Sequence, residues 1–142
     1  MQKYIHNMLQ FFELFEKLKY ETIEYGSSFT TILFKLEDKS KMKKFQIFLL
    51  KYLRLTDTVF SYRDDTLLVI LEETTIRWAI RLNESLRERI QFKWLNYDYY
   101  SSAIQWEFID SDEKLLKSLN KRLDIAIKLD SKECIHALSD ND

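Results

Sequence analysis

The stretch RLTDTVFSYRDDTLLVIL, residues 54–71, decides the fold, because it predicts two strands folded back on each other. Residues 58–62 alternate around the β-formers Val59 and Phe60, and residues 67–71 form a continuous apolar run. Such a run is typical of a strand buried on both faces of a sheet. The predicted turn lies between the strands and consists of Arg63, Asp64, Asp65 and Thr66. Polar groups held between two buried strands suit a functional site, although aspartates also favour ordinary solvated turns.

Helical and strand patterns alternate on both sides of this hairpin. Before the hairpin they predict a helix over residues 2–25, a strand over 29–36 and a helix carrying Met42 to Tyr52. After it they predict a helix from Thr74 or Thr75 to Ile90 and one or two strands within 92–108. A last helix opens near Asp110, and a frayed tail follows over 132–142. We therefore expect one domain over residues 1–142. The order predicts an α/β fold of the ferredoxin-like or palm type, a mixed sheet flanked by helices with a long N-terminal helix.

The composition excludes several classes of function. The 142 residues include one glycine and no proline, so a glycine-rich phosphate loop, a dinucleotide fingerprint and a nucleophile elbow are all absent. The net charge of −1 gives no overall attraction to nucleic acid or to an anionic membrane, and such binding would need a local patch. The single cysteine, Cys134, leaves no internal disulfide and favours a reducing, cytoplasmic setting. No apolar run approaches the roughly 18 residues of a membrane span.

Charged and aromatic clusters leave further alternatives open. Lysines 39, 41, 43 and 44 indicate either a solvated helix start or a surface for a phosphorylated ligand. The tryptophans Trp78, Trp94 and Trp106 favour a packed core or sheet face over a base-stacking platform, since no basic groove lies between them in the sequence. The N-terminal helix covers the sheet or, alternatively, contacts a protein partner or a second copy.

The order of these elements and several local strings resemble the GGDEF domain of diguanylate cyclases over residues 7–132. The string Glu24-Tyr25-Gly26 before the first strand is similar to a turn of that family, and Asp124-Ile125-Ala126-Ile127 is similar to its closing helix. The family's hairpin has an Arg-x-x-Asp, five residues, a five-residue signature and an apolar strand. In this sequence the pattern is matched by Arg54 and Asp57, then residues 58–62, then a signature formed by Arg63, Asp64, Asp65, Thr66 and Leu67.

Departures from the family pattern predict that the cyclase chemistry is lost. Arg63 and Asp64 replace the two glycines that let the backbone approach nucleotide phosphates. The strand-end aspartate that holds magnesium in the family aligns with Lys35, and Thr66 replaces the acid that follows Asp65. The family's guanine-recognition segment is also missing before residue 54. The resemblance therefore implies a degenerate domain that is not an enzyme, with no catalytic residue, no metal and no cofactor.

The Arg-x-x-Asp is the family feature that this sequence keeps. In the family it binds the product, cyclic di-GMP, so the resemblance implies a receptor site at Arg54 and Asp57. One alternative is that the two residues form an i,i+3 surface ion pair with little energetic weight. The domain is then a protein-protein interaction or dimerisation module, through its N-terminal helix or aromatic strand, and binds no nucleotide. We expect neither nucleic-acid binding nor a membrane span.

Overall fold

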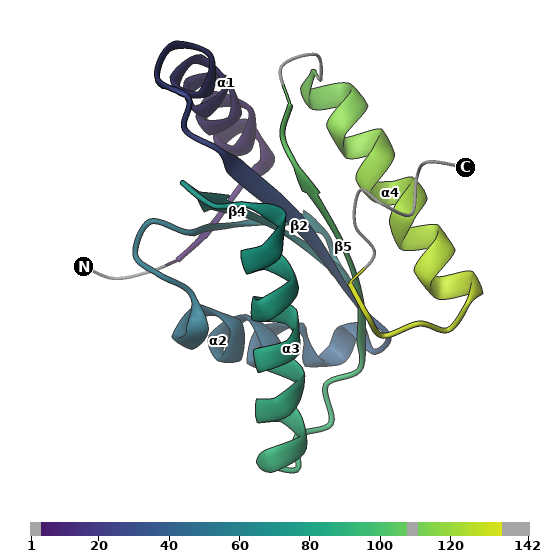
Figure 1. The fold of residues 1–142 in the computed structure, drawn as a ribbon. Coiled ribbons are helices and arrows are strands. Elements are labelled where there is room, and N and C mark those ends of the chain that lie inside the picture. Colours follow the sequence, from purple (N-terminus) through teal and green to yellow (C-terminus); the bar gives the residue numbers. More distant parts are fainter. Residues whose placement is uncertain (1–3, 108–110, 135–142) are drawn as a thin grey trace.

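The computed structural model describes residues 4–107 and 111–134, and within them helices and strands alternate (Figure 1). The elements are β1 (Ile5–His6), α1 (Met8–Tyr25), β2 (Phe29–Leu36), a short 3-10 helix η1 (Lys39–Lys41), α2 (Met42–Tyr52), β3 (Thr58–Arg63), β4 (Thr66–Glu72), α3 (Ile76–Phe92), β5 (Tyr99–Gln105) and α4 (Asp112–Lys128).

The strands form one mixed sheet in the order β1-β3-β4-β2-β5. β1 runs parallel to β3, and the other neighbouring strands are antiparallel. Helices α1 and α4 cover one face of the sheet, and α2 and α3 cover the other (Figure 1). The predicted fold class, a mixed sheet flanked by helices, is confirmed.

The central strand β4 contributes to the cores on both faces. Leu67, Val69 and Leu71 pack with α2 and α3, whereas Leu68 and Ile70 pack with α1 and α4. All five side chains are fully buried. The continuous apolar run is therefore the expected signature of a strand covered on both sides, and it fixes the hairpin rigidly in the middle of the domain.

The start of α1 differs from the prediction. Asn7 caps the helix by accepting a hydrogen bond from the Gln10 N–H (3.0 Å), and the Gln10 side chain accepts one from the Asn7 N–H (2.9 Å). This capping box begins the helix at Met8. The two residues before it, Ile5 and His6, pair with β3 instead of continuing the helix.

Of the region predicted to hold one or two strands, the described residues 92–107 contain a single strand, β5. The Asp98 carbonyl accepts from the N–H of Glu37, which directly follows β2. Because carbonyls alternate in direction along a strand, those of residues 99 and 103 face away from β2. Arginine side chains take up both: Arg87 donates to the Tyr99 carbonyl (3.0 Å) and Arg122 to the Ala103 carbonyl (2.9 Å). The last helix opens at Ser111, which accepts from the Lys114 N–H (3.2 Å), while Asp110 lies outside the described residues.

The chain after α4 is packed for as far as the structure describes it. The Lys132 ammonium donates to Glu37 (2.5 Å) and lies 3.7 Å from the centre of the Tyr100 ring. Cys134 is buried, and burial raises the pKa of its thiol to about 11. Residues 132–134 of the predicted frayed tail thus make contacts with the domain, and the remainder, 135–142, lies outside the described residues. Within the described chain no helix is both long and apolar enough to cross a bilayer.

Candidate functional site at the two ends of the hairpin

The residues predicted from the sequence lie in two groups, one at each end of β3. Arg54 and Asp57 precede the strand, and the signature turn follows it. Six residues of extended chain separate the groups by about 20 Å at 3.3 Å per residue. The structure therefore does not bring them into one site, and each end is described by its own contacts.

The signature turn is a two-residue connection between paired strands. Arg63 is the cross-strand partner of Thr66, so Asp64 and Asp65 form the loop. Neither has a positive φ, because the positive-φ residues of the described chain lie elsewhere. A register shift between Ser61 and Arg63 provides the extra bend. The hairpin thus turns without the glycines that the family signature has at this place.

A lysine faces the remaining signature acid. Lys35 on β2 is the cross-strand partner of Thr66, and its Nζ lies 4.0 Å from Oδ2 of Asp65. The other oxygen of Asp65, Oδ1, accepts a hydrogen bond from the Thr66 hydroxyl (2.8 Å). A divalent cation placed beside Asp65 would therefore meet one carboxylate and one ammonium group, which is a poor ligand set for magnesium.

The other polar groups near the turn are also paired. Lys39 lies 3.4 Å from Asp64 in an exposed ion pair, which adds little stability. Arg63 donates to Oδ1 of Asn120 on α4 (2.8 Å), and its guanidinium lies over the Tyr62 ring.

Glu37 does not join the acids of the turn. Its bond with Lys132 is the main reason that its pKa lies below the usual value. Among the described residues, no group of three or more His, Cys, Asp and Glu side chains is placed to hold a metal.

At the other end of β3, Arg54 and Asp57 form a closed clamp. The Arg54 guanidinium donates from Nη2 to Oδ1 (2.8 Å) and from Nε to both carboxylate oxygens (3.2 Å). The backbone N–H of Arg54 donates to Oδ2 (2.8 Å), and the N–H of Asp57 donates to the Arg54 carbonyl (3.0 Å). The Asp57 side chain is 1% exposed, whereas that of Arg54 is 42% exposed. The pair is thus deeper than the predicted surface pair.

The clamp also joins β3 to the end of β4. Nη2 of Arg54 donates to the Glu72 carbonyl (2.9 Å) and to the Thr74 hydroxyl (2.6 Å). Hydrogen bonding to Asp57 raises the pKa of Arg54 above its already high value. The guanidinium is therefore a permanent cation that holds together three segments of the hairpin.

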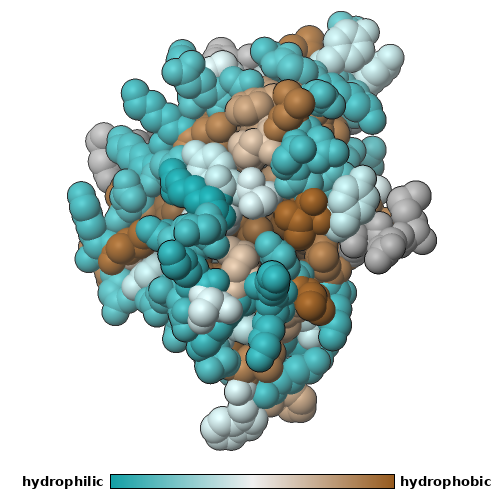
Figure 2. All heavy atoms as spheres, turned by 180° about the vertical axis from the view of Figure 1, so that it is seen from behind, coloured by the Kyte–Doolittle hydropathy of each residue, from teal (hydrophilic) through white to brown (hydrophobic). Residues whose placement is uncertain are grey.

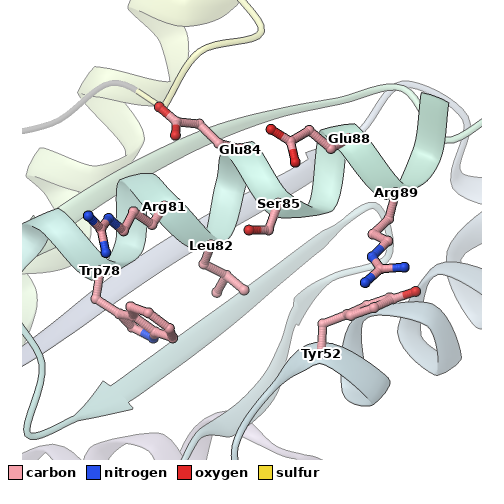
Figure 3. A pocket seen from close by; sticks show the side chains of 8 residues that line it. All are labelled: Tyr52, Trp78, Arg81, Leu82, Glu84, Ser85, Glu88 and Arg89. Carbon is pink, nitrogen blue, oxygen red and sulfur yellow. The ribbon is translucent and has the colours of Figure 1, made fainter. Parts of the chain in front are cut away.

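A cavity of about 530 Å³ lies next to the clamp (Figure 3). Its lining consists of Tyr52, Trp78, Arg81, Leu82, Glu84, Ser85, Glu88 and Arg89. The Arg54 guanidinium carbon lies 5.8 Å from the centre of the Trp78 ring, and the guanidinium of Arg89 lies at the same distance from that of Tyr52. Figure 3 shows Trp78 beside Arg81 at one end of the cavity and Arg89 over Tyr52 at the other.

Sequence reasoning missed these α3 residues. Their polar positions form the side of the helix opposite to its buried stripe, which is an ordinary pattern for a surface helix. Trp78 was the one residue in the sequence that could have indicated this cavity, because a large aromatic side chain interrupts the polar side of the helix. It is exposed, and so is Trp94, whereas Trp106 is buried and stacks on Phe29. The prediction of packed tryptophans is therefore correct for Trp106 alone.

Several solved structures share this arrangement of elements at low sequence identity. The GGDEF domain of YfiN from Pseudomonas aeruginosa is 12% identical and superposes with a TM-score of 0.78, over 94% of this chain and 96% of that one. The GGDEF domain of DgcB from Caulobacter crescentus, in complex with c-di-GMP, is 9% identical, with a TM-score of 0.75 over 94% and 89% of the two chains. The chain has the fold of a GGDEF domain.

In a longer protein of similar structure, the matching region covers only part of the chain. Diguanylate cyclase SiaD from Pseudomonas aeruginosa, in complex with its activator SiaC, is 11% identical with a TM-score of 0.77. The match covers 92% of this chain and 58% of SiaD. No protein-family model matches the sequence, and no curated protein matches it. The resemblance predicted from the hairpin is thereby confirmed at the level of the GGDEF fold.

Proposed function

We propose that this chain is a GGDEF-fold domain that makes no cyclic di-GMP and acts as a regulatory domain in cyclic di-GMP signalling. The observation that carries the first half is the Lys35–Asp65 pair at 4.0 Å, with Thr66 directly across from Lys35. By the resemblance described above, Lys35 and Thr66 stand where the family has its acids beside the substrate phosphates. A cation and a hydroxyl at these positions remove the negative charge that would hold magnesium.

The receptor role is supported by the exposed side of the clamp. Arg54 bonds Asp57, Glu72 and Thr74 through Nε and Nη2, which leaves the donors of Nη1 without a partner among these contacts. Nη1 can donate to a guanine or phosphate oxygen while the clamp stays closed. The nearby exposed ring of Trp78 offers a surface on which a purine stacks. The DgcB complex with c-di-GMP supports the choice of ligand.

Isothermal titration of cyclic di-GMP into the wild type and into two arginine variants tests the receptor role. Arg54→Lys keeps the charge and loses the planar fork, so we expect it to weaken binding at least about tenfold. The matched control is Arg63→Ala, which removes an arginine from the other end of the hairpin and should leave the affinity unchanged. A folded wild type that releases no heat with cyclic di-GMP contradicts the receptor role.

The missing cyclase activity is tested separately. Incubation of the wild type with GTP and magnesium should yield no cyclic di-GMP above a protein-free blank. Product formation that is abolished by Asp65→Ala would refute the loss of activity, because it would show that the one remaining signature acid supports catalysis.

A second candidate function, a dimerisation or interaction module that binds no nucleotide, is favoured by α1. This helix buries Phe11, Phe15 and Leu18 against the sheet and leaves a second apolar row exposed. The exposed row consists of Leu9, Phe12, Tyr20 and Ile23, which lie within about 80° of one another at 100° per residue.

An exposed row of this kind suits pairing with another helix. Light scattering on the wild type and on Ile23→Glu tests it, with Glu24→Lys as a polar control on the same helix. A dimer in the wild type that Ile23→Glu alone converts to a monomer supports this function, and a monomeric wild type refutes pairing of two copies through α1.

A further inference from the structure

A patch of aromatic and basic side chains lies where α2 meets the end of α3. We call it the α2–α3 patch, and it consists of Lys43, Lys44, Ile47, Lys51, Phe92, Lys93 and Trp94, all of them exposed. The end of α3 is the lower tip of the molecule in Figure 1, and in the opposite view of Figure 2 this tip carries pale and brown side chains. Phe92 is 79% exposed and Trp94 93% exposed.

Trp94 occupies a backbone position that disfavours a tryptophan. The Leu95 N–H donates to the Ile90 carbonyl (2.9 Å), and the Trp94 N–H donates to the Gln91 carbonyl (3.2 Å). These two bonds are the Schellman motif, whose left-handed residue is usually glycine. Trp94 has a φ of 56°. A bulky residue at positive φ is strained, and strain that persists without a packing reason indicates a functional one.

The charge of the patch is one-sided along α2. Residues 39–55 carry six cationic side chains and no acid. Lys43, Lys44, Ile47 and Lys51 fall within about 100° of the helix circumference, at 100° per residue. None of these three lysines has an ion pair or hydrogen bond within the described chain.

A shallow hollow of about 260 Å³ joins this face of α2 to the end of α3. Its lining includes Lys44, Ile47, Lys51, Lys93 and Leu95. The acids of α3, Glu84 and Glu88, line the other cavity, together with Arg81 and Arg89 (Figure 3). The patch is thus apolar at its centre and cationic around it.

We infer that the α2–α3 patch binds the surface of an anionic membrane. Phe92 and Trp94 are exposed at the end of α3, and a bilayer interface accepts aromatic rings at headgroup depth without a complementary pocket. Lysines beside the rings reach anionic headgroups, each adding about fivefold in affinity, while their aliphatic stems lie along the acyl boundary. A protein partner would need both an acidic surface and a pocket for two neighbouring rings. The near-neutral net charge does not oppose this, because the charge is local.

Vesicle co-sedimentation of the full chain tests the inference, with phosphatidylcholine vesicles compared with vesicles that contain about 30% phosphatidylglycerol. We expect binding to the anionic vesicles alone, weakened by added salt. The decisive variant is Trp94→Gly, which relieves the strained residue and removes the ring. It should raise the melting temperature by about 3 °C and weaken vesicle binding at least about tenfold. A better-folded variant that binds less cannot be explained by misfolding.

A matched pair of lysine variants tests the electrostatic half. Lys44→Gln with Lys51→Gln should weaken anionic-vesicle binding by about 25-fold, from two lysines at about fivefold each. Lys117→Gln with Lys121→Gln changes the net charge equally on exposed positions of α4 and should have no effect.

Three outcomes overturn the inference. The first is a wild type that does not bind anionic vesicles. The second is equal loss in both lysine pairs. The third is dimerisation that depends on Trp94 without vesicle binding, which would make the patch an interface between two copies.

Discussion

Arg54→Ala should destabilise the domain severely, because it leaves the Asp57 carboxylate buried without its cation. Breaking a buried ion pair by removing one partner costs about 3–5 kcal/mol. Asp57 keeps its bond from the Arg54 N–H in the variant, and the 42% exposure of the Arg54 side chain lets water reach the carboxylate. We therefore lower the expected cost to about 3 kcal/mol, which is a large part of the 5–15 kcal/mol that stabilises a typical domain.

Urea unfolding followed by far-ultraviolet circular dichroism measures this cost. With a slope of about 2 kcal/mol per molar urea, the midpoint should fall by about 1.5 M at an unchanged slope. Arg63→Ala is the control, since its hydrogen bond to Asn120 is exposed, and it should cost less than about 1 kcal/mol.

A double-mutant cycle with Asp57→Ala separates the pair from its surroundings. Because both side chains belong to one network, the coupling energy should be at least about 1 kcal/mol. If Arg54→Ala is no less stable than Arg63→Ala, or if the coupling is zero, the clamp does not stabilise the hairpin and the reasoning from its burial fails.

Three further perturbations follow from the geometry. Gly26→Ala should cost about 1 kcal/mol in thermal unfolding, because Gly26 caps α1 at φ 74°. A Cβ there would touch nothing, so the cost comes from backbone strain, and Gly26→Asn should cost less. Equal melting temperatures for the wild type and both variants would contradict backbone strain as the cause. The free energy of unfolding should fall between about pH 9 and 11, because the buried Cys134 thiol, whose pKa is raised to about 11, keeps its proton while an unfolded thiol loses it. Cys134→Ala should reduce this fall by up to about 3 kcal/mol in urea unfolding. An unchanged pH profile in the variant would refute a role of this thiol. The double variant Lys35→Asp with Thr66→Glu should gain thermal stability when magnesium is added, whereas Lys35→Asp alone should not. If magnesium changes the melting temperature of neither variant, the turn cannot form a metal site.

The hairpin was predictable because its signals are local. The apolar run of β4 can be recognised directly in the sequence, and the charged residues 63–65 precede it. The start of α1 was less clear because Ile5 continues the apolar spacing of the helix. Asn7 with Gln10 carried the correct boundary, and a reading that weighed this capping box would have placed the helix start at Met8.

The contacts of the candidate site were not predictable, because they come from segments far apart in the chain. Burial of Asp57 depends on packing around the end of β4, and the clamp is completed by Thr74, whose hydroxyl lies 20 residues after Arg54. Lys35 meets Asp65 only through the register of β2 on β4. The left-handed conformation of Trp94 gave no signal at all, since glycine is the residue that marks such a position in a sequence.

The arginines that bond the outer carbonyls of β5 have a consequence for how this domain meets other molecules. An open strand edge is a template on which a foreign strand can add itself, and proteins protect such edges. Here Arg87 and Arg122 occupy two of the acceptors that an added strand would need. The opposite edge of the sheet is β1, only two residues long. In the described part of the chain, both edges are therefore poor templates for an extended peptide, which favours recognition through the helices and loops that surround the sheet.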